Sequence, residues 1–466
     1  MVFSSLTFLL LFLPLLFALY FVRSSLRWRN GVLLVMSLLF YAWGEPVWIV
    51  AMIAATLVNY FCAAAIERSH DPRRRKLILA LGVAVSLSFL LYFKYSAFFL
   101  NSFAALFGLS WRMEAPRMPI GISFYTFQIL TYSVDVYRGK AQAQRSPLRL
   151  LLYVSCFPQL IAGPIVQYAD IEAQLGERSV LPDDFTAGMQ RFVKGLAKKV
   201  LLANVCGAAL GELTLAGAGA AMSVAGAWMG AFLYTIQLYF DFSAYSDMAI
   251  GLGKALGFTY KENFDFPYAS LSVTEFWRRW HISMGSFFRD YVYIPLGGSR
   301  CGRARTIRNI AVVWALTGLW HGASWNFVLW GLYFAVLLVL ERYVLKDVLA
   351  RVPRLLRWFV CFVLVMISWV VFYYTDLSAM AQHVLALFGV GVSGLSDAAA
   401  AAVVRKYSFY PLLAWVLSLP VVPAVARRLG ERTRSVVGLV CTVLLFVASL
   451  LFLVGQSYNP FIYFRF

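Results

Sequence analysis

The chain has 466 residues, of which 61% are hydrophobic and only 14% are charged, and its mean hydropathy is +0.73. Roughly a quarter of the residues in soluble domains are charged, so this composition excludes a soluble protein and indicates a polytopic membrane protein. The net charge of +19 does not indicate nucleic-acid binding, because the basic residues fall in short loops between apolar segments. We expect most of them to set the topology, while a few can attract an anionic cytoplasmic substrate such as a coenzyme with phosphates.

The apolar segments predict an all-α fold with about ten to twelve transmembrane helices, at roughly 20 residues per crossing. Residues 4–22 form the first helix, and its charges follow it rather than precede it. A cleaved signal peptide has the opposite order, so we expect a retained helix with its N-terminus outside the cytoplasm. Residues 31–44 and 47–66 form a pair, and the basic loop after them is cytoplasmic. Residues 77–99 then cross outward, and residues 119–136 return.

The middle of the chain is less regular. Residues 150–168 contain Pro158, Gly163 and Pro164, which predict a break or re-entrant turn that only protein or a water-filled cavity can accommodate. Residues 188–208 and 222–241 are predicted spans. The stretch from 242 to 300 is too polar for a lipid-facing helix, and we expect short, broken or in-plane helices there. Later spans are predicted at about 308–320, 324–341, 357–374, 408–425 and 435–455.

His321 is the strongest candidate for a functional residue. It is one of only four histidines and lies in an apolar segment. An ionisable group at membrane depth is by default a functional-site hypothesis, and imidazole accepts protons near neutral pH. If the span enters near Arg308, His321 lies roughly 20 Å deep, past the midplane of the bilayer. The alternative is a neutral histidine that hydrogen-bonds between helices for packing.

Further segments contain polar and aromatic residues where a simple membrane-spanning helix would be uniformly apolar. They are residues 119–128 (PIGISFYTFQ) with 135–138 (DVYR), 157–164 (FPQLIAGP), 237–247 (QLYFDFSAYSD), 276–283 (FWRRWHIS) and 288–298 (FRDYVYIPLGG). Together with Trp320-His321-Gly322 and the closing NPFIYFRF, they resemble the membrane-bound O-acyltransferase (MBOAT) family over nearly the whole chain. The most similar branch contains the membrane subunits of alginate, peptidoglycan and cellulose O-acetylation. Ser299 departs from that branch, in which we expect asparagine.

The resemblance implies a single membrane domain over 1–466, with core motifs at about 119–341, broken or in-plane helices around a central cavity, and no separate soluble domain. It places the invariant histidine of the family on His321 and a second polar position on His281, and we expect both to be catalytic. A structural histidine in an Arg/Trp-rich segment is the alternative for His281. The candidates for substrate binding are Trp320, Asn326, Gln237, Tyr239 and Ser283.

Acyl transfer from a thioester to a hydroxyl requires removal of a proton, stabilisation of the oxyanion and exclusion of water. We expect His321 to act as general base and His281 or Asn326 to orient it or to hold the carbonyl oxygen. Asp241 and Asp247 are six positions apart and would not share a helix face, so we expect them to pair with Arg278, Arg279 or Arg289.

Several other features predict structural roles. The glycines from Gly251 to Gly257 lack phosphate-loop spacing and are interpreted as helix packing. The scattered cysteines predict no metal site. His383 matches no motif and is expected to be structural or exposed.

The predicted function is a membrane O-acetyltransferase of the bacterial cytoplasmic membrane, with both termini outside the cytoplasm. It takes an acetyl group from a cytoplasmic thioester donor, for which acetyl-CoA is the expected molecule, and holds no permanently bound cofactor. The expected partners are a periplasmic acetyltransferase, an exported polysaccharide or peptidoglycan as acceptor, and membrane lipid. A transporter or flippase, or a non-catalytic scaffold of a polysaccharide secretion complex, is the alternative. A transporter requires substrate movement without chemistry, and a scaffold tolerates replacement of His321.

Overall fold

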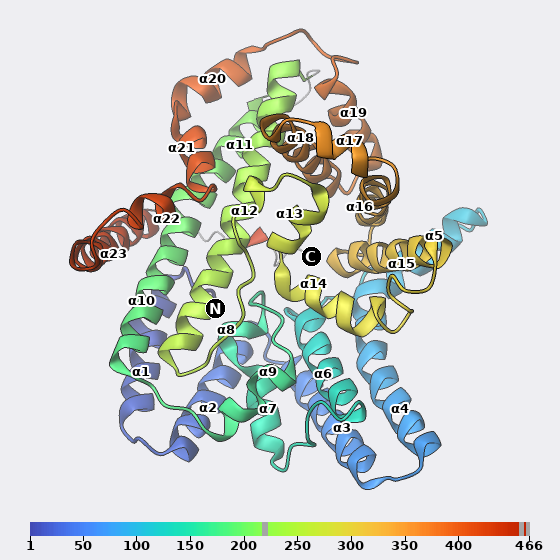
Figure 1. The fold of residues 1–466 in the computed structure, drawn as a ribbon, viewed down its shortest axis with the longest axis vertical. Coiled ribbons are helices and arrows are strands. Elements are labelled where there is room, and N and C mark those ends of the chain that lie inside the picture. The colour runs from blue at the N-terminus through green and yellow to red at the C-terminus, as the bar shows by residue number, and fades with distance from the viewer. Residues whose placement is uncertain (217–221, 456–460, 463–466) are drawn as a thin grey trace. The chain divides into compact units, whose positions relative to one another are not determined.

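The computed structural model describes residues 1–216, 222–455 and 461–462 (Figure 1). Every regular element in this part of the chain is a helix, which confirms the predicted all-α fold. The chain divides into two compact units, which are described separately. Unit 1 comprises Met1–Val193 and Tyr245–Lys261, and unit 2 comprises Lys194–Ala244 and Glu262–Phe466.

Unit 1 contains the N-terminal helices. They are η1 (Phe8–Phe12), α1 (Leu13–Phe21), α2 (Leu26–Gly44), α3 (Ile49–Arg68), α4 (Pro72–Leu90), η2 (Leu91–Tyr95), α5 (Ser96–Leu106), α6 (Ile122–Tyr137), α7 (Pro147–Ser155), α8 (Phe157–Leu160), α9 (Tyr168–Gly176) and most of α10 (Pro182–Ala197). A buried polar triad joins three of them. Asn59 of α3 donates to Ser86 of α4 at 2.8 Å, and Ser133 of α6 donates to Asn59 at 2.7 Å.

The break predicted within residues 150–168 is present in unit 1. α7 ends at Ser155, and the short α8 ends at Leu160. A Cβ on Gly163 would lie 2.6 Å from the Cα of Gln159, so only glycine fits this reversal. The ring of Phe157 packs on those of Phe12 and Phe40, at 5.4 Å from each. The turn therefore lies inside packed protein, as irregular backbone in a membrane protein requires.

Unit 2 contains the remaining elements. They are η3 (Lys198–Ala203), α11 (Asn204–Ala216), the first part of α12 (Val224–Ala255), η4 (Pro267–Ala269), α13 (Val273–Arg279), α14 (Ile282–Phe288), η5 (Arg289–Tyr293), α15 (Arg303–His321), α16 (Trp325–Tyr343), α17 (Lys346–Arg351), α18 (Arg354–Tyr373), α19 (Leu377–Leu387), α20 (Ala398–Tyr407), α21 (Tyr410–Leu417), α22 (Val421–Ala426) and α23 (Glu431–Val454).

α15 and α16 form a close helical hairpin in unit 2. A Cβ on Gly318 of α15 would collide with the backbone carbonyl of Phe327, and a Cβ on Gly331 of α16 would collide with that of Trp314. Small residues that let two helix backbones approach are typical of membrane helix pairs. The hairpin fixes the end of α15, where His321 lies.

The predicted break after residue 241 is wrong, because α12 continues from Val224 to Ala255. Two carboxylates of this continuous helix are neutralised by lysine and arginine from other helices. Asp241 pairs with Lys199 at 2.5 Å in unit 2, and Asp247 pairs with Arg191 at 2.9 Å in unit 1. A buried charge that is paired does not need to interrupt a helix.

The partners predicted for these aspartates are therefore also wrong. Arg279 instead pairs with Glu275 at 2.9 Å, and Arg289 pairs with Asp290 at 2.8 Å. The packing interpretation of the glycines in α12 agrees with the structure, because a Cβ on Gly251 would lie 2.6 Å from the backbone nitrogen of Phe192.

Among the residues that the structure describes, five helices are long and apolar enough to cross a membrane. They are Ile49–Arg68, Pro72–Leu106, Trp325–Tyr343, Arg354–Tyr373 and Glu431–Val454. The predicted span at 408–425 is wrong as one helix, because α21 ends at Leu417 and α22 begins at Val421. Pro420 between them lacks the N–H that a continuous helix needs. The count of ten to twelve crossings stays a prediction.

Candidate active site

His321 is the last residue of α15, and its side chain is buried at 2% exposure. Gly322 follows in an extended conformation and ends the helix. The imidazole is enclosed by aromatic rings. Its centroid lies 5.0 Å from that of Trp330 and 5.2 Å from that of Phe372, and both rings are nearly perpendicular to it. The side chain most suited to proton transfer thus lies in an apolar shell that excludes water.

His281 lies between α13 and α14 in the left-handed conformation, with φ at 46°. This uncommon geometry for a residue with a Cβ turns the chain so that the imidazole is fully buried. The ring packs edge-on against Phe242 of α12, at 4.7 Å between centroids. A strained backbone that holds a buried polar side chain is typical of functional sites.

Asn263 determines which nitrogen of His281 carries the proton. Its Oδ1 accepts the backbone N–H of Ser283 at 3.2 Å and the hydroxyl of Ser283 at 2.9 Å, which identifies this atom as the oxygen. The same Oδ1 lies 3.1 Å from Nδ1 of His281, so Nδ1 must be the donor. In the neutral ring the lone pair then resides on Nε2.

Burial keeps this ring neutral. His281 is not part of any of the five helices long enough to cross a membrane. Desolvation lowers the pKa of His281 to about 3, so the imidazole carries no charge at neutral pH.

Trp320 connects the two histidines. Its ring centroid lies 5.0 Å from that of His321 and 5.7 Å from that of His281. The indole is itself buried at 4% exposure. The structure therefore brings together three residues that the sequence predicted for the site, although His281 and His321 are forty positions apart.

An aromatic cluster packs around Trp280, the residue that precedes His281. Trp280 lies 6.3 Å from Tyr239, 6.1 Å from Tyr268 and 4.9 Å from Trp369 between ring centroids. Tyr268 donates its hydroxyl to the carbonyl of Thr235 at 2.8 Å and so ties the cluster to α12. Tyr239, which was predicted to bind substrate, is a buried member of this cluster and contacts His281 through Trp280.

Asn326 caps a neighbouring helix. Its Nδ2 donates to the carbonyls of Phe372 at 3.2 Å and Val371 at 3.4 Å, in the last turn of α18. These carbonyls have no partner within their own helix. The contact holds Phe372 in place against His321. Because Nδ2 is occupied, Asn326 is poorly suited to stabilise an oxyanion.

Ser283 and Gln237 occupy different positions. Ser283 belongs to the group around His281 through Asn263. Gln237 packs toward α11, where a Cβ on Gly207 would collide with its amide nitrogen. Residues two apart in a helix point about 200° apart, so Gln237 and Tyr239 lie on different sides of α12. The contacts of the described residues therefore bring Ser283, but not Gln237, to the histidines.

Sequence reasoning missed Asn263, Phe242, Trp330 and Phe372. Asn263 carried one signal in the sequence, since it is an amide within an aromatic stretch. The structure buries its side chain fully. Phe242 lies in the singled-out stretch 237–247, whereas Trp330 and Phe372 carried no signal, because the chain contains many similar side chains. In the described part of the chain, no group of three His, Cys, Asp or Glu side chains can hold a metal ion.

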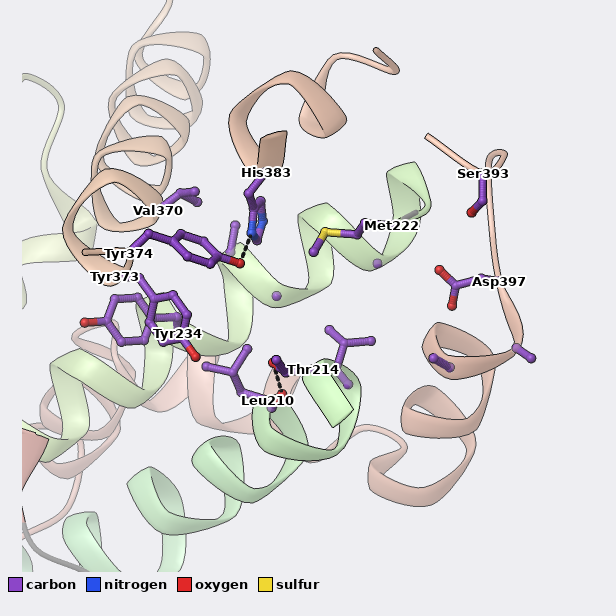
Figure 2. Close-up of a pocket in the computed structure, with 16 residues that line it drawn as sticks. Leu210, Thr214, Met222, Tyr234, Val370, Tyr373, Tyr374, His383, Ser393 and Asp397 are labelled. Atoms are coloured by element: carbon purple, nitrogen blue, oxygen red, sulfur yellow. Dashed lines mark hydrogen bonds between the residues drawn. The ribbon is translucent and has the colours of Figure 1, made fainter. Parts of the chain in front are cut away.

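His383 lies outside this group and has a structural environment, as predicted. Its Nδ1 lies 2.9 Å from the hydroxyl of Tyr374 (Figure 2). Its Nε2 lies 3.0 Å from the carbonyl of Ala227. His383 and Tyr374 border a cavity of about 610 Å³, together with Tyr234 and Tyr373. His383 therefore fixes the start of α12 to the segment after α18.

Lys199 and Asp241 form a second buried polar group, and each is 2% exposed. Asp241 Oδ2 also accepts the backbone N–H of Ile462 at 2.7 Å, and Lys199 lies 4.6 Å from the ring centre of Phe461. The aromatic composition of residues 458–466 suggests a docking surface for an extracytoplasmic partner. All of them except Phe461 and Ile462 lie outside the described residues.

The arrangement places two imidazoles in a water-poor aromatic shell. Such a shell suits a proton transfer next to a reactive thioester, because water is excluded and electrostatic interactions are strong.

The chain is similar to known acyltransferases. The family model of MBOAT, the membrane-bound O-acyltransferase family, matches residues 140–381. The chain is 39% identical to "Probable alginate O-acetylase AlgI" of Azotobacter vinelandii over 100% of both chains. It is 42% identical to the protein of the same name from Pseudomonas aeruginosa, over 85% of this chain and 76% of that one. It is also 31% identical to the peptidoglycan O-acetyltransferase of Helicobacter pylori, over 85% of this chain and 81% of that one.

Proposed function

The chain belongs to the membrane-bound O-acyltransferase family, and from that membership we propose that it takes an acetyl group from a cytoplasmic thioester and delivers it for O-acetylation of an exported polysaccharide or peptidoglycan. The chain is a multi-pass membrane enzyme that transfers acetyl groups to hydroxyls. The proposal adds the donor, the acceptor and the residues that do the chemistry.

The proposed donor is acetyl-CoA. Its phosphates suit the basic segments of the chain, one of which begins at Arg300 and continues into the first turns of α15, the helix that carries His321. The proposed acceptor follows from the relatives, whose names describe acetylation of alginate and of peptidoglycan. We place the protein in the bacterial cytoplasmic membrane with both termini outside the cytoplasm. A separate extracytoplasmic acetyltransferase would complete the transfer.

His321 is the proposed general base. The observation that carries this role is its position at the end of α15, buried among Trp320, Trp330 and Phe372. An imidazole in this shell can take the proton from the attacking hydroxyl while water is kept from the thioester. His281 contacts the same ring of Trp320 and has its lone pair on Nε2. In this proposal it orients the acceptor or accepts the proton next.

The test is the acetyl content of the exported polymer in cells that carry His321→Ala, with the amount of protein in the membrane measured in parallel. We expect acetylation to fall by about 10²- to 10⁴-fold at unchanged abundance, which is the usual contribution of a general base. His70→Ala is the matched control, because His70 is exposed between α3 and α4. Full acetylation in His321→Ala would assign His321 to packing and favour a scaffold.

Consumption of acetyl-CoA by purified protein in proteoliposomes tests the donor. Wild type should release coenzyme A in the presence of an acceptor, and His321→Ala should not. Movement of intact acetyl-CoA across the vesicle membrane without release of coenzyme A would instead indicate a transporter.

A further inference from the structure

A groove runs beside the start of α18 in unit 2, where the break between α21 and α22 opens the protein surface. Its volume is about 710 Å³, and it is lined by apolar side chains that include Leu355, Leu419 and Val425. Leu355 is 73% exposed and Val425 is 55% exposed. Side chains of this kind on a membrane protein suit the acyl chain of a lipid.

Two arginines also line the groove. Arg354 is the first residue of α18, and Arg428 follows α22. None of the described residues that line it is acidic. Both arginines lie in basic segments at the ends of apolar stretches, and such segments mark the cytoplasmic side of the membrane. A groove that combines apolar walls with two arginines complements a molecule that has an apolar chain and an anionic group.

We propose that this groove binds an anionic glycerophospholipid of the cytoplasmic leaflet. The phosphate lies between Arg354 and Arg428, and one acyl chain lies along Leu355 and Val425. Guanidinium groups bind phosphate oxygens in a bidentate manner, and basic pockets between membrane helices on the cytoplasmic side bind anionic headgroups. The lipid proposal does not rest on the proposed acetyl transfer.

The groove is connected to the candidate active site. Trp358, which lines the groove, donates its indole N–H to the carbonyl of Tyr268 at 2.9 Å. Tyr268 packs on Trp280, the residue before His281, at 6.1 Å between centroids. A bound lipid would stabilise the packing of Trp358, Tyr268 and Trp280, so its removal should lower the thermal stability of the protein.

Native mass spectrometry of the purified full-length protein tests the proposal, with equimolar phosphatidylglycerol and phosphatidylcholine of matched chains added after delipidation. Each arginine near an anionic headgroup contributes about 1 kcal/mol, so wild type should prefer phosphatidylglycerol by roughly thirtyfold. Arg354→Gln/Arg428→Gln should reduce this preference to nearly none. Arg427→Gln/Arg432→Gln is the matched control, because it removes the same amount of charge at exposed residues close to Arg428 in the sequence but outside the groove.

Two further variants separate charge from shape. Arg354→Lys/Arg428→Lys should keep most of the preference, and it keeps the test decisive if the glutamine variant does not fold. Ala424→Trp fills the groove with both arginines intact and should reduce retention of lipid. The proposal is overturned if the groove and control variants lose equal selectivity, or if wild type shows none.

Soluble competitors distinguish the lipid from other phosphates. Glycerol 1-phosphate and coenzyme A are added separately to the complex with phosphatidylglycerol. Neither should displace the lipid at concentrations tenfold above it, because neither fills the apolar part of the groove. Displacement by either one would make the groove a site for a free anion and refute the lipid assignment.

Discussion

Oδ1 of Asn263 lies 3.1 Å from Nδ1 of His281 and receives the backbone N–H of Ser283 as well. One amide oxygen therefore holds both the tautomer of the histidine and the first turn of α14. His281 is in the left-handed conformation at the same position, so the backbone and the side chain are fixed together. A histidine held in this way presents Nε2 in one direction only.

Replacement of Asn263 by alanine should lower both stability and turnover. The change leaves buried donors on His281 and Ser283 without an acceptor, and each such group costs about 1–3 kcal/mol. Asn263→Asp supplies an acceptor of the same shape and should retain more activity. The measurements are the thermal unfolding midpoint in detergent and the rate of acetyl transfer. Equal loss in both variants would show that acceptance by Oδ1 is not the important contact.

The stability of the protein should fall as the pH drops below about 6.5. Burial lowers the pKa of His281 to about 3, whereas an unfolded histidine titrates near 6.5. Between these values the unfolded state binds more protons, so the free energy of unfolding falls by about 1.4 kcal/mol for each unit of acidification. Above about pH 6.5 this contribution is complete and constant.

His281→Gln should remove this dependence without changing the titration of other groups. Unfolding midpoints of wild type and variant, measured from pH 7.5 to 4.5, should diverge in slope only below about 6.5. Parallel curves over the whole range would mean that His281 does not remain neutral in the folded protein.

Gly331→Ala should destabilise the α15–α16 hairpin. The added Cβ would meet the backbone carbonyl of Trp314, which cannot rotate away as a side chain can. We expect a loss of about 2 kcal/mol or more and lower activity, since α15 carries His321. Gly438→Ala in α23 is the control, because nothing lies within 4 Å of its new Cβ. That variant should be as stable as wild type or slightly more stable.

The Lys199–Asp241 pair should behave as a unit. Both side chains are 2% exposed and 2.5 Å apart. Lys199→Met leaves a buried carboxylate, and Asp241→Leu leaves a buried ammonium, so each should lose about 3–5 kcal/mol. The double variant removes both charges and should recover much of this loss. A double-mutant cycle based on unfolding midpoints checks the coupling, and strictly additive losses would contradict it.

Parts of the site could be predicted from single segments. Residues such as His321 and Trp320 stand out because a polar or ionisable group in an apolar helix is expensive unless it has a role. The spans at 324–341, 357–374 and 435–455 correspond to α16, α18 and α23 for a related reason. A long apolar stretch between basic loops has few alternatives to a membrane helix.

Other predictions were wrong because a residue far away in the sequence changes the structure that the local composition indicates. The polar composition after residue 241 suggested short or broken helices, yet α12 continues to Ala255, and Lys199 and Arg191 neutralise Asp241 and Asp247. These partners lie more than forty residues away, and nothing in the local sequence identifies them. The span at 408–425 failed for the opposite reason, since its apolar composition concealed a local break at Pro420.

The sequence by itself determined that this is an all-α membrane protein of the acyltransferase family, and it indicated His321 as the candidate functional residue. Hydrophobic length, basic loops and local motifs carry that information, because each is a property of consecutive residues. Only the tertiary structure decided that Trp320 contacts both histidines, that Asn263 fixes the tautomer of His281, and that Phe372 encloses His321. These contacts join residues far apart in the chain, and they depend on how helices pack, which composition and periodicity do not specify.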